Sequence, residues 1–177
     1  DRKAARIAAD IYEHTIPVIE DAETVGRYAP LDESQLFEME YWSLEQAKLG
    51  SGRRKRLAGK VVYVTGAGRG LGAAIAKAFA AEGAELYLVD RDATELEGLA
   101  RSLSASWEQV DVTDEAAVRR SFDRAVAIHG GIDGAISNAG AAEMGRMHES
   151  SEALRRGFEV NFFAHQSVAA AATRILL

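Results

Sequence analysis

The sequence contains no cysteine and only two prolines in 177 residues. Without cysteine the chain can form neither disulfide bonds nor thiolate metal sites. It also lacks any apolar run near the ~20 residues that cross a membrane as a helix, so we expect a soluble chain with no membrane contact. No apolar signal-peptide core follows the charged start, which favours a cytoplasmic protein.

Basic residues are fewer than acidic ones, and the net charge is -6 at pH 7. An acidic chain of this kind argues against nucleic acid as a main partner. The histidines show no metal-ligand spacing, so we expect no metal site and interpret them as surface or packing residues. They are His14, His129, His148 and His165.

The N-terminal part of the chain carries helical signals and no strand pattern. The stretch through Tyr12 is typical of the end of a helix, and Pro17 fits the first turn of a second, short helix that ends near Gly26. Asp32 fits the N-cap of a third helix that continues to Leu49. That helix is too apolar for a fully solvated surface, so we expect it to pack against another element.

A short basic segment, residues 51–60, separates these helices from the rest of the chain. It can be an anion or nucleic-acid patch, or a solvated linker between domains. The linker interpretation is favoured because the charged run is short and isolated.

From Lys60 onward the pattern alternates between strands and helices. Strands are predicted at 61–65, 85–89, 107–110 and 132–137, and helices at 70–82, from 92, from 113 or 114 to 129, and from about 150 to the end, the last one either straight or kinked. Strands separated by helices of about 10–15 residues imply a parallel sheet with right-handed crossovers. We therefore expect an α/β, Rossmann-like doubly wound parallel sheet that is partial, with strand order 3-2-1-4 and an N-terminal helical extension.

The first predicted strand runs into a glycine-rich turn that opens directly onto an alanine-rich helix. The N-terminus of a helix offers unpaired N–H groups and a partial positive charge, and glycine lets the backbone approach phosphates closely. A glycine-rich motif is weak on its own, but this one has the strand–turn–helix context that such sites require. We predict that it binds a dinucleotide pyrophosphate, with cofactor contacts from Thr65, Gly66, Arg69, Gly70, Leu71 and Gly72.

An acidic residue, Asp90, closes the second strand about 20 residues beyond the glycine turn. Its carboxylate can accept hydrogen bonds from the adenosine ribose hydroxyls and repels a 2′-phosphate, which favours NAD over NADP as the cofactor. Arg69 and Arg91 keep NADP open as the less favoured choice, since either can meet a 2′-phosphate.

Polar residues also follow the later strands. Asp111 and Val112 follow the third strand and can line an adenine pocket, although aspartate there is also a common turn former. Asn138-Ala139-Gly140 follows the fourth strand, where the small residues leave room for a cofactor and the asparagine can tie neighbouring strands together. Asn161 lies among apolar residues of the last helix, as either a satisfied core amide or a residue that bends the helix and holds water near the site.

Together these motifs resemble the cofactor-binding half of the short-chain dehydrogenase/reductase family. The Thr-Gly-x-x-x-Gly-x-Gly turn at 65–72, the acid Asp90, the adenine-side Asp111, the Asn-Ala-Gly at 138–140 and the helical Asn161 occur in the order of that family. The resemblance implies an NAD(P)-dependent oxidoreductase with a small-molecule substrate. It also implies that Asn161 is catalytic and that the full-length protein is a homo-oligomer.

The N-terminal part has a narrower resemblance. Tyr12-x-His14-Thr15-Ile16 and residues 36–49 resemble the junction of the bifunctional rhamnulose-1-phosphate aldolase/alcohol dehydrogenases. This implies that residues 1–56 are the tail of a class II aldolase-like domain plus a linker, and that 57–177 are the truncated N-terminal part of the dehydrogenase domain. The implied activity is cleavage of a sugar phosphate to dihydroxyacetone phosphate and lactaldehyde, followed by oxidation of the aldehyde in rhamnose metabolism.

One departure from the family pattern limits this prediction. The family needs a serine and a Tyr-x-x-x-Lys beyond the asparagine helix, because the tyrosine acts as acid/base and the lysine lowers its pKa. The sequence has no Tyr-x-x-x-Lys, and all five tyrosines precede Asn161. We expect a piece of a longer protein that is inactive as given. A non-catalytic dinucleotide-binding module is the alternative, and a nucleotide-sugar epimerase would need a different glycine spacing.

Overall fold

The computed structural model describes residues 2–41, 55–142 and 151–176. They divide into two units, one formed by the described residues before 42 and one by those from 55 onward. None of the helices in these ranges combines the length and the apolar character that a membrane crossing needs.

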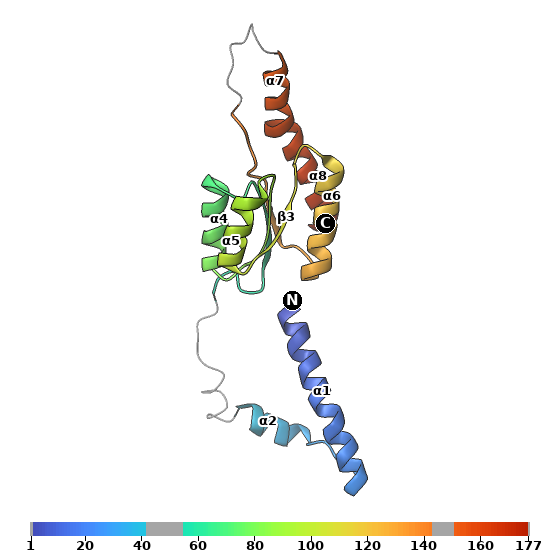
Figure 1. The fold of residues 1–177 in the computed structure, drawn as a ribbon. Helices are drawn as coiled ribbons and strands as arrows, with labels where there is room; N and C mark the ends of the chain where they lie inside the picture. Colours follow the sequence, from blue (N-terminus) through green and yellow to red (C-terminus); the bar gives the residue numbers. More distant parts are fainter. Residues whose placement is uncertain (1, 42–54, 143–150, 177) are drawn as a thin grey trace. The chain divides into compact units, whose positions relative to one another are not determined.

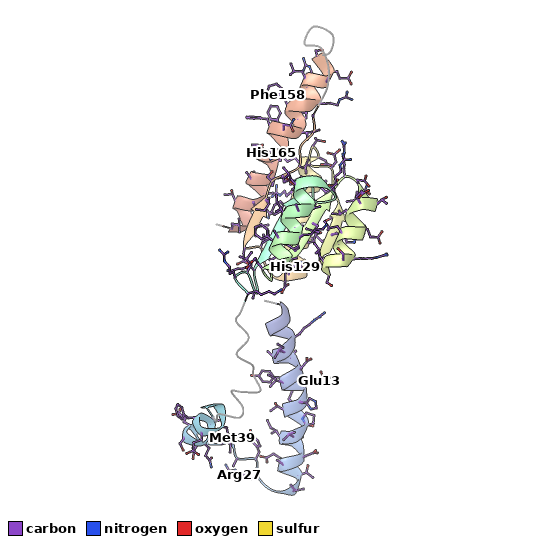
Figure 2. The ribbon with its side chains drawn as sticks, turned by 90° about the vertical axis from the view of Figure 1, so that its left-hand side faces the viewer. Glu13, Arg27, Met39, His129, Phe158 and His165 are labelled. Atoms are coloured by element: carbon purple, nitrogen blue, oxygen red, sulfur yellow. The ribbon has the colours of Figure 1, made fainter. Side chains whose placement is uncertain are left out.

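The N-terminal unit consists of the helices α1 (Arg2–Val25) and α2 (Glu33–Tyr41), marked in Figure 2 by Glu13 and Met39. The predicted break into two helices at Pro17 is wrong, because α1 is continuous and contains Pro17 in its interior. Proline removes one backbone donor and its ring crowds the carbonyl four residues earlier. The helix of 24 residues nevertheless continues on both sides of the proline.

The predicted cap of α2 is confirmed. The Oδ1 atom of Asp32 accepts a hydrogen bond from the Gln35 N–H at 2.9 Å, and Gln35 Oε1 accepts one from the Asp32 N–H at 3.2 Å. This reciprocal pair is a capping box, which fixes the first turn. The predicted continuation to Leu49 and the basic segment up to residue 54 lie outside the described residues, as does His148.

The second unit is built on a four-stranded parallel sheet with the order β3-β2-β1-β4, as predicted. The strands start and end within three residues of the predicted limits, and the fourth is the shortest. They are β1 (Val61–Thr65), β2 (Glu85–Asp90), β3 (Ser106–Gln109) and β4 (Gly134–Ile136).

Helices cover both faces of this sheet: α4 and α5 lie on one face, and α6 and α8 on the other (Figure 1). The predicted last helix is not uniform, because a π-helical segment interrupts it between α7 and α8. The helices are α4 (Gly70–Ala81), α5 (Ala93–Leu103), α6 (Glu115–His129), α7 (Ser151–Phe158), the π-helix η1 (Glu159–Phe163) and α8 (Ala164–Leu176).

Every residue of β1 is buried, as expected for a central strand covered by helices on both faces. Its side chains alternate between two cores, with Val62 and Val64 facing α4 and α5. Tyr63 faces α6, where its ring stacks on Phe122 at 4.0 Å between centroids and its hydroxyl lies 2.5 Å from Ser121 Oγ. Burial raises the pKa of Tyr63, so the hydroxyl stays protonated.

Two of the histidines contribute to packing or local bonding in this unit. His129 is buried at the end of α6, with its ring edge-on to Tyr87 and its Nδ1 atom 3.3 Å from Glu85 Oε2. His165 lies on α8, and its Nδ1 atom is 2.6 Å from Ser137 Oγ at the end of β4. The latter pair joins the edge strand to the helix that covers it.

We expect the substitution Phe122→Ala to lower the free energy of unfolding by about 3–5 kcal/mol, because it leaves a cavity beneath the Tyr63 ring. Urea denaturation followed by circular dichroism measures this loss. The matched control is Phe158→Ala, since Phe158 is 54% exposed (Figure 2), and its effect should stay within about 0.5 kcal/mol. Equal losses for the two variants would contradict the described core.

Candidate functional site

A cleft of about 290 Å³ lies at the carboxyl ends of the strands. In open parallel sheets this edge is where ligands bind, because the loops that follow the strands converge there. The residues that line it come from the ends of all four strands, from the start of α4 and from the helical segment after residue 158. They are Gly66, Arg69, Leu71, Gly72, Asp90, Arg91, Val110, Asp111, Val112, Asn138, Ala139, Gly140, Ala141 and Val160.

The glycine-rich turn brings the first turn of α4 into direct contact with the end of β1. A Cβ atom on Gly72 would lie 1.9 Å from the carbonyl oxygen of Gly66, and one on Gly66 would lie 2.7 Å from the Cα of Ala139. Gly66 and Gly70 also have φ angles of +62° and +56°, in the region that favours glycine. Only glycine permits this close approach at 66 and 72.

Helix α4 starts without help from a side chain. Arg69, the residue before its first turn, is extended and makes no side-chain capping bond. The first N–H groups of a helix lack partners within the helix, and those of α4 adjoin the cleft at Leu71 and Gly72. This geometry suits an anionic diphosphate, so the turn fits a nicotinamide dinucleotide.

Asp90 ties the end of β2 to this turn. Its Oδ2 atom accepts a hydrogen bond from the Gly68 N–H at 2.9 Å, and its Oδ1 atom accepts one from the Asp92 N–H at 3.0 Å. A carboxylate has about four acceptor positions in all, so two remain for hydroxyl donors. The half-buried Asp90 therefore supports the turn and still presents acceptors to the cleft.

Asp111 satisfies both interpretations of the sequence, as a turn former and as a cleft residue. Its Oδ1 atom accepts hydrogen bonds from the N–H and the hydroxyl of Thr113, at 2.9 and 2.7 Å. These bonds, with a smaller contribution from the positive charge of Arg91, hold the pKa of Asp111 below its ordinary value. The neighbouring Val112 is buried and adds apolar surface to the cleft.

Asn138 joins β4 to β1, as expected from the sequence. Its Nδ2 atom donates to the carbonyls of Thr65 and Gly66, at 3.1 and 3.2 Å. The buried hydroxyl of Thr65 accepts from the N–H groups of Asn138 and Ala139, at 2.9 and 3.0 Å. Thr65 thus faces the sheet rather than the cleft, and it fixes the position of the loop that forms the opposite wall.

Asn161 lies in the π-helical segment and holds the same loop. Its Oδ1 atom accepts from the Ala141 N–H at 3.0 Å, and its Nδ2 atom donates to the Ala141 carbonyl at 2.8 Å. The amide is satisfied, but it is exposed rather than part of the core. The adjacent Val160 lines the cleft, whereas Asn161 does not.

Most of the predicted cofactor residues line the cleft. Thr65 and Gly70 are the exceptions: Thr65 holds the neighbouring loop through its hydroxyl, and Gly70 contributes a positive φ angle to the turn. Sequence reasoning missed Val110, Ala141 and Val160. Val110 ends the predicted third strand and Val160 precedes Asn161, so both had a positional signal, while Ala141 had none. Within the described ranges no cluster of three His, Cys, Asp or Glu residues can hold a metal ion.

Residues 60–177 match the short chain dehydrogenase family. The chain belongs to this family. Residues 1–49 match the second domain of class II aldolases. An uncharacterized oxidoreductase of Bacillus subtilis is 30% identical over 155 residues, which are 83% of this chain and 22% of that protein. The D-threitol dehydrogenase of Mycolicibacterium smegmatis is 41% identical over 101 residues, 54% of this chain and 39% of that enzyme.

Solved dehydrogenase structures agree with this assignment. A short chain dehydrogenase from Burkholderia cenocepacia in complex with NADP superimposes with a TM-score of 0.66 at 34% identity, covering 68% of this chain and 52% of that one. A short-chain type dehydrogenase/reductase from Mycobacterium ulcerans gives a TM-score of 0.64 at 29% identity, covering 67% and 47%. The chain therefore spans about half the length of these dehydrogenases, and it has the Rossmann-like fold of the family.

We expect Gly72→Ala to destabilise the chain and to abolish dinucleotide binding, because the new Cβ would collide with the Gly66 carbonyl. The matched control is Gly98→Ala in α5, where a Cβ meets nothing within 4 Å; it should raise stability by about 0.5–1 kcal/mol through helix propensity. Thermal unfolding of both variants measures the difference. A Gly72→Ala protein as stable as the original would show that the helix and strand do not meet as described.

Proposed function

We propose that this chain is the cofactor-binding half of an NAD-dependent oxidoreductase of the short-chain dehydrogenase family. The observation that carries the proposal is the uncapped start of α4, held against the Gly66 carbonyl at the edge of a cleft. A helix N-terminus of this kind stabilises a diphosphate through its free N–H groups and its dipole.

Each wall of the cleft has a role in this proposal. The first-turn N–H groups of α4 bind the diphosphate, and Asp90 accepts hydrogen bonds from the adenosine ribose. Asp111 and Val112 border the adenine, and Ala139 and Gly140 leave space on the nicotinamide side. When bound, the nicotinamide supplies the hydride chemistry.

Asn161 is the residue of this chain that the family resemblance assigns to catalysis. Its amide holds both backbone groups of Ala141, so in this structure it fixes the loop that follows β4 against the π-helical segment. The proton transfer of the reaction is assigned by the same resemblance to a tyrosine and a lysine in a Tyr-x-x-x-Lys pattern that these 177 residues do not contain.

For the parent protein we propose a bifunctional sugar-phosphate aldolase/dehydrogenase that oxidises a small aldehyde such as lactaldehyde, in rhamnose metabolism. The aldolase match at residues 1–49 supports the fusion. So does the Bacillus subtilis oxidoreductase, whose alignment covers 83% of the chain and so extends beyond residues 60–177. A cytoplasmic homo-oligomer, without nucleic-acid or membrane partners, is part of the same proposal.

The proposal is tested by titrating the chain with NAD and NADP and by assaying alcohol oxidation in the same preparation. We expect weak, saturable binding of NAD and no turnover, because the Tyr-x-x-x-Lys pattern is not in the sequence. Binding of neither cofactor would refute the dinucleotide site. Measurable alcohol oxidation would refute the assignment of the proton-transferring residues. If a longer protein that contains this chain also shows no turnover, the alternative of a non-catalytic binding module would be favoured.

Asp90→Ala should relax the preference for NAD. We expect the ratio of the NADP to the NAD dissociation constant to fall about tenfold, equivalent to about 1.4 kcal/mol, since the ribose loses an acceptor and a 2′-phosphate loses a repulsive charge. Calorimetric titration with both cofactors gives the ratio. The control is Asp123→Ala on α6, where the carboxylate pairs with Arg174, and it should leave the ratio unchanged. An unaltered ratio in Asp90→Ala would contradict the assigned role.

A further inference from the structure

The end of β3 holds the turn that follows β2 by a side-chain hydrogen bond. Gln109, the last residue of β3, donates from Nε2 to the carbonyl oxygen of Arg91 at 2.8 Å. The two residues are 18 positions apart in the sequence, and the side chain of Gln109 is otherwise exposed. This bond fixes the backbone of a residue that lines the cleft.

The turn has three further fixed points, and one of them acts on the same peptide group as the Gln109 bond. The carboxylate of Asp90 accepts from the N–H groups of Gly68 and Asp92, and the Val110 N–H donates to the Asp90 carbonyl at 2.9 Å. The peptide between Arg91 and Asp92 is held at two atoms, its carbonyl oxygen by Gln109 and its N–H by Asp90 Oδ1. The bonds that Asp90 makes with the Gly68 and Val110 N–H groups do not involve this peptide.

We propose that Gln109 is a positioning residue: by anchoring the Arg91 backbone, it presents the Arg91 guanidinium to a phosphate on the adenosine ribose and so determines how well NADP is accepted beside NAD. The inference rests on the proposed function, because it assigns a specificity role within the same cleft. NAD binding relies on Asp90, which the Gly68 and Val110 N–H groups hold in place without Gln109. Losing the Gln109 bond therefore weakens NADP binding selectively.

The charges around Arg91 fit this role. Arg91 is exposed and close enough to Asp111 for its positive charge to influence that carboxylate, while Asp111 already accepts two hydrogen bonds from Thr113. The positive charge of Arg91 thus lies near a carboxylate that already has other partners, and an incoming phosphate offers the guanidinium a charge-assisted acceptor. Arg69 is the second cation at the cleft, but it belongs to the turn before α4 and is not held by Gln109.

The test substitutes Gln109 by methionine, which keeps the length of the side chain and removes the donor. We expect Gln109→Met to raise the dissociation constant for NADP by about three- to tenfold, the effect of one hydrogen bond, and to leave that for NAD unchanged. Gln166→Met, the same exchange at an exposed position of α8, is the matched control and should change neither. Ligand-detected NMR or calorimetry measures both constants, and circular dichroism verifies the fold.

A double-mutant cycle separates positioning from general loosening. If Gln109 acts through Arg91, then Gln109→Met has no further effect on NADP binding in an Arg91→Met background. Four outcomes would overturn the inference: an unchanged NADP dissociation constant in Gln109→Met, equal losses of affinity for both cofactors, additive losses in the double variant, or no detectable NADP binding by the original chain. In each of these cases, binding of NAD would still uphold the proposed function. If neither cofactor binds, the proposed function itself fails.

Discussion

The close approach of α4 to β1 is the constraint on which the site depends. The Gly66 carbonyl occupies the space that any side chain at position 72 would need, so the helix can begin directly where the strand ends. Because parallel strands end at one edge of the sheet, Asp90 and Asn138 reach the same turn from the two neighbouring strands. A larger residue at position 72 would move the helix N-terminus away from all of these groups.

The short strand β4 depends on side-chain bonds at both of its ends. At its start, Asp133 accepts from the Val61 N–H at 2.8 Å and pairs with Lys60 at 2.7 Å; the Lys60 bond is the main reason why the pKa of Asp133 lies below its ordinary value. At its end, the Asn138 amide and the Thr65 hydroxyl lock the two strands together. A strand of three residues makes few ladder bonds, so these contacts set the position of the loop that walls the cleft.

The sequence alone predicted the sheet order and most of the residues of the cleft, because both follow from local patterns. Buried parallel strands show as apolar runs, and the residues after each run must meet at one edge. The features that the sequence did not predict depend on tertiary context. Helix α1 passes through Pro17, where the sequence predicted the start of a second helix. The interruption of the last helix, by contrast, lies at Asn161, the residue that the sequence offered as one that bends it. Neither the Gln109–Arg91 bond nor the position of Ala141 in the cleft has a local signal, since each joins segments far apart in the sequence.

A comparison of three helix starts distinguishes structural from functional needs. Helices α5 and α6 each begin with an aspartate whose carboxylate accepts a first-turn N–H: Asp92 from Thr94 at 3.1 Å and Asp114 from Ala117 at 2.9 Å. Such a cap stabilises a helix by about 0.5–2 kcal/mol. Helix α4 has Arg69 at this position, with no capping bond. A capping carboxylate there would occupy the position of a phosphate and would repel it. Of these three helices, only α4 begins beside the cleft, and only α4 lacks the stabilising cap. This loss of stability is expected where a ligand, rather than a side chain, completes the hydrogen bonds of the first turn.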